Sequence, residues 1–141
     1  MSVVDSPVGW VQEHIRKYVE SGGREGHEWR PGVFTLLLTT TGRKSGRPRR
    51  TALIYQPRGD AYVVVASHGG APEHPAWYRN LAVNNTAEVQ VGADVFTAKA
   101  RTATGDERAE LWELMTRVWP AYDDYATKTD REIPVVVLER A

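Results

Sequence analysis

Cysteine is absent from the 141-residue sequence. The chain therefore cannot form a disulfide bond, a thiolate zinc site, an iron–sulfur cluster or a cysteine nucleophile. An excess of one charge is also missing, because 18 Lys and Arg residues balance 18 Asp and Glu residues, which argues against a general nucleic-acid-binding protein. No secretory signal is expected, and no apolar run reaches the roughly 18 residues of a membrane span. These absences favour a globular protein of the cytoplasm.

Several catalytic and binding motifs are missing as well. No glycine precedes Lys44-Ser45 at the spacing of a Walker loop, no G-x-G-x-x-G follows a strand and opens a helix, and no serine lies in G-x-S-x-G. The histidines lack the spacing with carboxylates that marks a metal site, so no metal is expected; they are His14, His27, His68 and His74.

Hydrophobic periodicity predicts helices and strands in the order α-βββ-α-ββ-α-β. The strands are expected at Val33–Thr40, Arg50–Gln56, Ala61–Ser67, Ala87–Val91, Val95–Ala103 and Ile133–Leu138. Antiparallel hairpins dominate this order in a short chain. It therefore favours an α+β fold with a compact barrel of about six strands over a doubly wound sheet.

The first predicted helix has Ser6 as its N-cap and ends at Gly22-Gly23. Its apolar residues recur at helical spacing: Val8, Val11, Ile15, Tyr18 and Val19. This stripe either packs on the body of the protein or lies on a membrane surface or a partner, and packing is favoured. We therefore divide the chain into an N-terminal helix and linker, residues 1–31, and a barrel domain, residues 32–141.

The last predicted helix opens with Thr104 and Glu107 in a capping-box pattern, and Pro120 stops it. Around its end lie aromatic residues spaced by three, near one face of a helical turn: Trp119, Tyr122 and Tyr125. They could cover a flat ligand or form a packing stripe, and the residues alone favour packing.

Residues 43–50 read RKSGRPRR, in which five of eight residues are cationic: Arg43, Lys44, Arg47, Arg49 and Arg50. Ser45 adds a hydroxyl, and Gly42 and Gly46 let backbone amides approach a ligand closely. Donors and positive charge in one turn predict a receptor for phosphate or carboxylate. The alternative is a solvated hairpin tip without a ligand.

A second glycine-containing loop ends a strand at Ser67-His68-Gly69-Gly70 and leads to a helix that starts near Pro75. A helix N-terminus favours an anion or a polar ring edge. Trp77 and Tyr78 could flank a planar cofactor there, or they could fill the core.

Three segments in this order, LLLTTTGRKSGRPRRTALIY, VVASHGGAPEHPAWYRNLAVNN and WPAYDDYATKTDREIPVVVLER, resemble the deazaflavin (coenzyme F420)-dependent nitroreductase family. The resemblance covers about residues 32–140. It implies a split β-barrel related to the oxidoreductases that bind flavin mononucleotide, with mostly antiparallel strands and flanking helices, in agreement with the strand order.

The resemblance also implies coenzyme F420, whose deazaflavin ring carries a phosphate-linked, glutamate-bearing tail. Residues expected to hold phosphate and tail are Arg43, Lys44, Ser45 and Arg49. Residues expected along the cofactor and its ring are Arg50, Thr51, Ala52, Leu53, Ile54, Val65, Ala66, Ser67 and His68, and the helix start adds Ala76, Trp77, Tyr78, Arg79 and Asn80. Trp119, Tyr122 and Tyr125 would cover the substrate side.

The implied reaction is hydride transfer from the reduced cofactor to a small electron-poor acceptor such as a quinone, an enone or a nitro compound. Ser67 and Tyr122 are the candidate catalytic proton donors. His68 stands where relatives often carry lysine, which predicts a pH-dependent grip on the tail. Ile54 and Trp119 replace tyrosines of the nitroreductase itself, which indicates an altered acceptor pocket.

Alternative functions are a flavin-mononucleotide enzyme of the same barrel and a non-catalytic module that binds an anion or cofactor. The sequence predicts no nucleic-acid partner, leaves monomer and dimer open, and keeps a peripheral contact with the inner face of the membrane as an alternative role of the first helix.

Overall fold

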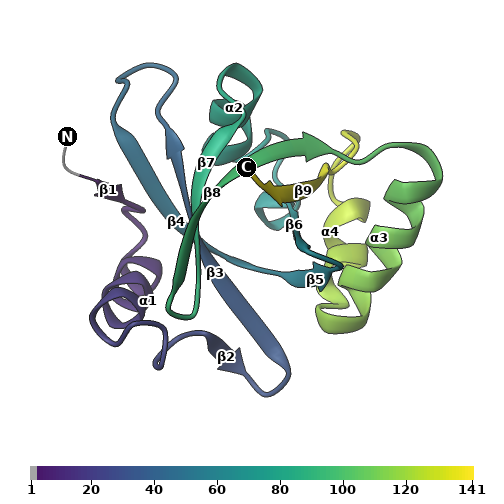
Figure 1. Cartoon of the computed structure of the whole chain (residues 1–141). Coiled ribbons are helices and arrows are strands. Elements are labelled where there is room, and N and C mark those ends of the chain that lie inside the picture. Colours follow the sequence, from purple (N-terminus) through teal and green to yellow (C-terminus); the bar gives the residue numbers. More distant parts are fainter. Residues whose placement is uncertain (1–2) are drawn as a thin grey trace.

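The computed structural model describes residues 3–141, which form one curved sheet with helices around it (Figure 1). The strands are β1 (Val4–Asp5), β2 (Glu28–Arg30), β3 (Val33–Thr41), β4 (Pro48–Ile54), β5 (Gln56–Arg58), β6 (Ala61–Val65), β7 (Thr86–Val91), β8 (Asp94–Thr102) and β9 (Val135–Arg140). The helices are α1 (Gly9–Glu20), α2 (Ala76–Val83), α3 (Gly105–Val118) and α4 (Ala121–Thr127), with a 3₁₀ turn, η1, at His68–Gly70.

The sheet order is β1-β4-β3-β7-β8-β9-β6-β5, and β2 pairs with β3. All pairs are antiparallel except β1 with β4. The six predicted strands are confirmed with shifted ends, and the short β1, β2 and β5 were not predicted. The α+β split-barrel prediction is confirmed.

Strand alternation explains how one sheet contributes to three apolar clusters. Along β6, Val64 and the following Ala66 face the barrel interior, whereas Val63 and Val65 face the layer beneath α3 and α4. Leu36 and Leu38 of β3 belong to the interior, while Leu37 points to α1. Figure 1 shows α3 and α4 together on one side of the sheet and α1 well apart from them.

Helix α1 packs on the sheet, as the favoured interpretation predicted. Val11, Ile15 and Tyr18 are buried against Leu37. The Tyr18 hydroxyl donates to the Thr35 carbonyl at 3.0 Å and accepts from the Gly92 amide at 2.7 Å. The division of the chain at residue 31 stays a prediction.

The predicted N-cap of the first helix is wrong. Helix α1 begins at Gly9 with Val8 as its N-cap. The backbone amide of Ser6 instead donates to the Arg50 carbonyl at 2.9 Å, which continues the pairing of β1 with β4. Ser6 is therefore part of an extended segment.

The capping box of the last predicted helix, α3, is also wrong, because its two side-chain bonds do not form. Thr104 is the N-cap of α3 but makes no side-chain cap bond. Glu107 binds Arg101 of β8 instead, with distances of 2.6 and 2.9 Å. A charged partner on another element outcompetes the local backbone contact.

No helix within residues 3–141 has both the length and the apolar character needed to cross a bilayer.

Candidate functional site

Three hollows share lining residues and form one groove along β4, the end of β6 and the start of α2. The central hollow, of about 570 Å³, shares Ala52, Leu53 and Ser67 with an aromatic hollow of about 260 Å³. On its other side it shares Arg49 and Asn80 with a cationic hollow of about 190 Å³. The groove therefore changes from cationic to aromatic along its length.

The cationic hollow is built by the turn between β3 and β4. The Gly42 amide donates to the Arg47 carbonyl at 2.8 Å, and the Gly46 amide donates to the Gly42 carbonyl at 2.8 Å. A Cβ at Gly42 would lie 2.7 Å from Ser45 Oγ and 3.1 Å from the Arg47 carbonyl oxygen, so the turn is closely packed at this position. These contacts hold Arg43, Lys44 and Ser45 at the groove.

Asn80 fixes this turn to α2. Its side chain is 2% exposed. Its Oδ1 accepts from the Arg43 amide at 3.2 Å and from Arg43 Nη1 at 2.9 Å, while its Nδ2 donates to Thr40 Oγ1 at 3.0 Å. All polar atoms of this buried amide are engaged, so it orients the Arg43 guanidinium.

The charges of the turn are largely unpaired. Across residues 3–141, no carboxylate lies within 4.0 Å of Arg43, Lys44, Arg47 or Arg49. Arg50 differs, because its Nε lies 2.6 Å from Asp5 Oδ1 and its Nη2 3.2 Å from Oδ2. The turn thus presents positive charge that an anionic ligand could neutralise.

The aromatic hollow is flanked by three tryptophans from different elements. Trp10 of α1 stacks on Trp29 of β2 with ring centroids 6.0 Å apart, and Trp29 lies 5.4 Å from Trp119. The guanidinium of Arg30 lies 4.5 Å from the Trp29 ring centroid. A wall of this kind suits a flat, apolar ligand.

Two residues that carry a hydroxyl group, Ser67 and Tyr122, line this end of the groove. Ser67 lines both the central and the aromatic hollow, and its hydroxyl makes no hydrogen bond to any residue in the described part of the chain. Tyr122 lines the aromatic hollow, and burial raises its pKa well above the ordinary value. Tyr122 therefore stays a neutral phenol at physiological pH.

His14 of α1 also borders the aromatic hollow. Thr35 donates its hydroxyl proton to the Gly26 carbonyl at 2.7 Å, so His14 Nε2, 3.0 Å away, donates to Thr35 Oγ1. Burial lowers the pKa of His14, and the ring is neutral at physiological pH.

Most residues predicted for the site lie along these hollows: Arg43, Lys44, Ser45, Arg49, Arg50, Thr51, Ala52, Leu53, Ile54, Val65, Ser67, His68, Ala76, Trp77, Asn80, Trp119, Tyr122 and Tyr125. Three others lie elsewhere. Ala66 is fully buried in the barrel, Tyr78 bonds Thr102 Oγ1 at 2.9 Å, and Arg79 pairs with Glu73 at 3.9 Å on the exposed side of α2.

Sequence reasoning did not find the contribution of the N-terminal region. Residues 4–8, together with Trp10 and Val11, line the central hollow, and Trp29 lines the aromatic one. One signal was available, because Trp10 is a large aromatic residue outside the predicted apolar stripe. In the structure it is 63% exposed.

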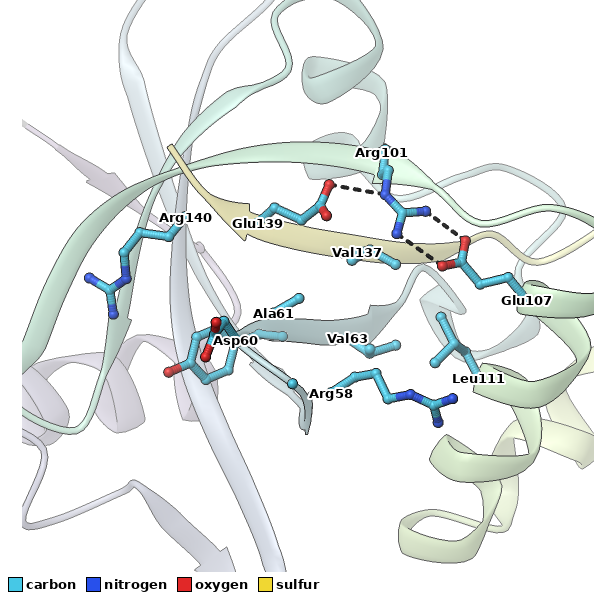
Figure 2. Close-up of a pocket in the computed structure, with 12 residues that line it drawn as sticks. Arg58, Asp60, Ala61, Val63, Arg101, Glu107, Leu111, Val137, Glu139 and Arg140 are labelled. Atoms are coloured by element: carbon cyan, nitrogen blue, oxygen red, sulfur yellow. Dashed lines mark hydrogen bonds and ion pairs between the residues drawn. The ribbon is translucent and has the colours of Figure 1, made fainter.

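A separate hollow of about 690 Å³ lies between α3 and the outer face of β6 and β9 (Figure 2). Most of its charges are paired: Arg101 binds both Glu107 and Glu139, Arg58 binds Glu110, and Arg140 binds Asp94. Because most of these charged side chains are already paired, fewer of them are available to bind a charged ligand here than in the groove.

Comparison with known proteins agrees with this geometry. A family model described as F420H(2)-dependent quinone reductase matches residues 10–140. An F420H(2)-dependent quinone reductase of Mycobacterium tuberculosis strain H37Rv is 39% identical, covering 93% of this chain and 96% of the relative. A solved domain-swapped dimer is 40% identical with a TM-score of 0.73, covering 95% of this chain and all of the other. A solved F420-H2 dependent reductase is 44% identical with a TM-score of 0.69, covering 74% and 93%.

Proposed function

Because the chain belongs to the F420H(2)-dependent quinone reductase family, it is an F420-dependent oxidoreductase, and we propose that its groove holds the cofactor beside a quinone-type acceptor. The observation that carries this proposal is the order of the three hollows, from the cationic one through the central one to the aromatic one.

The residues of the groove fit this cofactor. Its polyanionic tail needs several cationic donors, and the turn offers Arg43, Lys44 and Arg49, which have no carboxylate partner among residues 3–141. Its flat ring needs shallow apolar walls, which Ala52 and Val65 provide in the central hollow. Arg43, Lys44, Ser45 and Arg49 would hold the tail; Thr51, Ala52, Leu53, Val65 and Ala76 would border the ring.

When bound in reduced form, the deazaflavin supplies a hydride. The protein then needs to hold an acceptor flat against the ring and to exclude water. Trp119 and Tyr125 border the space for the acceptor. Ser67 offers a hydroxyl proton at the junction of the two hollows, and Tyr122 offers a phenolic proton.

The acceptor end favours quinones over nitro compounds in this proposal. Ile54 and Trp119 line the aromatic hollow where the nitroreductase itself carries tyrosines. An aliphatic and an indole side chain give stacking and apolar contact but fewer hydroxyl donors for a nitro group.

The test mixes the purified protein with reduced F420 and a soluble quinone and follows the cofactor absorbance. We expect oxidation of the cofactor that depends on protein and quinone. Binding of flavin mononucleotide in a yellow protein, with no turnover of F420, would support the alternative enzyme. Tight cofactor binding without turnover of any acceptor would support the non-catalytic module.

A peripheral membrane contact through α1 also stays a prediction. Val8, Trp10 and Val19 remain exposed on this helix. Co-sedimentation with anionic vesicles, compared with a Trp10→Ser variant, measures whether these side chains bind a lipid surface.

A further inference from the structure

Residues 66–74 connect β6 to α2 and form one wall of the groove. Three consecutive residues of this loop have left-handed backbones: His68 (φ 48°), Gly69 (φ 62°) and Gly70 (φ 81°). The conformation of His68 is unfavourable for a residue with a Cβ, and it persists only where the surroundings hold it. Within the loop, the Gly70 amide donates to the Ser67 carbonyl at 2.9 Å, the Ala71 amide donates to the His68 carbonyl at 3.1 Å, and His68 Nδ1 lies 3.2 Å from the Glu73 carbonyl. The 3₁₀ turn η1 also packs against α4.

The guanidinium of Arg131, in the segment between α4 and β9, contacts this loop at several points. Arg131 Nε donates to the Ala71 carbonyl at 2.9 Å, Nη1 to the Ala66 carbonyl at 3.2 Å, and Nη2 to the Ser67 carbonyl at 2.7 Å. Nη1 also lies 3.0 Å from Nδ1 of His74. All three nitrogens of the guanidinium therefore bind one loop at points spread from residue 66 to residue 74.

We propose that Arg131 is a positioning residue of the F420 site and that its bond to His74 makes the shape of the loop, and hence cofactor binding, sensitive to pH. This inference rests on the proposed function for its effect on the cofactor. Arg131 lines none of the groove hollows, so it acts through Ser67 and Gly69, which do. Lysine cannot replace it, because an ammonium lacks the planar fork that reaches three carbonyls.

The bond to His74 fixes the protonation state of that ring. Arginine only donates, so Nδ1 must accept, and the ring must be neutral with its proton on Nε2. Burial, followed by the charges of Arg131 and Arg79, lowers the pKa of His74 from its ordinary value of 6.5. Protonation would place an N–H group and a positive charge against Arg131.

The other groups around His74 do not offset this charge. The Tyr78 ring packs edge-on with centroids 4.9 Å apart, and Glu73 pairs with Arg79 at 3.9 Å. His68 Nδ1 lies 3.2 Å from the Glu73 carbonyl. As the pH falls below 6.5, the unfolded loop takes up a proton that the folded loop resists. The ordered loop therefore loses stability until, below the lowered pKa, His74 is protonated and its contact is lost.

The first experiment needs no cofactor: amide hydrogen exchange of residues 67–71 in the free protein. Arg131→Lys is expected to speed exchange of the Gly70 and Ala71 amides about tenfold or more. Arg108→Lys is the matched control, since Arg108 Nη2 donates to the Ile133 carbonyl at 2.7 Å on the same C-terminal segment, away from the groove. Exchange in Arg131→Lys equal to that of the unaltered protein would overturn the proposal.

The second experiment measures the Kd of F420 by fluorescence from about pH 8 to about pH 5. His68 lines the groove and is a second histidine beside the cofactor, so all variants carry His68→Asn, which tolerates a left-handed backbone. We expect binding to weaken about tenfold towards acid pH in this background. His74→Asn keeps an acceptor for Arg131 but cannot titrate, and it should flatten the profile.

An acid-side loss that persists in His74→Asn would overturn the role of that residue, and unaltered affinity in Arg131→Lys would overturn the positioning role. If no variant binds F420 at any pH, the proposed function fails, and the exchange experiment still decides whether Arg131 holds the loop.

Discussion

Removing two charges from the basic turn should separate binding from stability. In the double variant Arg43→Ala, Lys44→Ala, the fold loses one guanidinium contact, Arg43 Nη1 to Asn80 Oδ1 at 2.9 Å, while Lys44 is exposed and unpaired within residues 3–141. That loss costs about 1 kcal/mol, or about 3 °C in Tm. Two lost charge-assisted bonds to the cofactor tail cost about 3 kcal/mol or more, so the Kd of F420 should rise about 100-fold or more.

The assay is fluorescence titration of F420, with a thermal melt of each protein. The matched control removes the same charge elsewhere, in Lys17→Ala, Arg117→Ala, because both side chains are exposed on helices away from the turn. The control should bind F420 nearly as the unaltered protein does. A double variant of the turn that binds like the control, or that loses Tm and affinity in proportion, would refute the reasoning.

Three further substitutions, at Trp119, Ser67 and Gly70, test other parts of the groove, and Gly69→Ala serves as a control for the last. Trp119→Ala removes the ring 5.4 Å from Trp29 and should raise the KM of a quinone about tenfold with an unchanged Kd of F420; equal changes in both would contradict the separation of the two ends. Ser67→Ala should lower kcat about 100-fold if its hydroxyl donates the proton, and a kcat within a factor of about two would assign the role to Tyr122. Gly70→Ala places a Cβ 2.7 Å from the Tyr125 carbonyl oxygen at φ +81° and should destabilise the fold by about 2 kcal/mol or more in urea unfolding. Gly69→Ala, with no atom within 4 Å of its Cβ, should cost less.

The sequence predicted the elements whose evidence is local. The long strands follow from apolar alternation, since residues such as Val63 and Val64 fill the two cores on either side of β6. The basic turn followed from five cations and two glycines within a few residues.

Elements and contacts without an apolar pattern of their own were missed. β2 lies in a polar stretch, and its pairing of Glu28 with Phe34 is decided by β3. β1 is only two residues long and is held by Arg49 and Arg50 of β4. Arg131 contacts residues of the 66–74 loop that lie more than 55 positions away in the sequence. No local sequence pattern could predict these contacts.

The placement of tryptophan has a practical consequence. Four of the five tryptophans border the groove: Trp10, Trp29, Trp77 and Trp119. The fifth, Trp112, lies outside it and donates to Asp123 Oδ1 at 2.9 Å. Intrinsic emission of the protein will therefore be dominated by indoles that a coloured ligand approaches, and quenching should report occupancy without any attached dye. Replacing Trp112 by Phe would leave only tryptophans that border the groove.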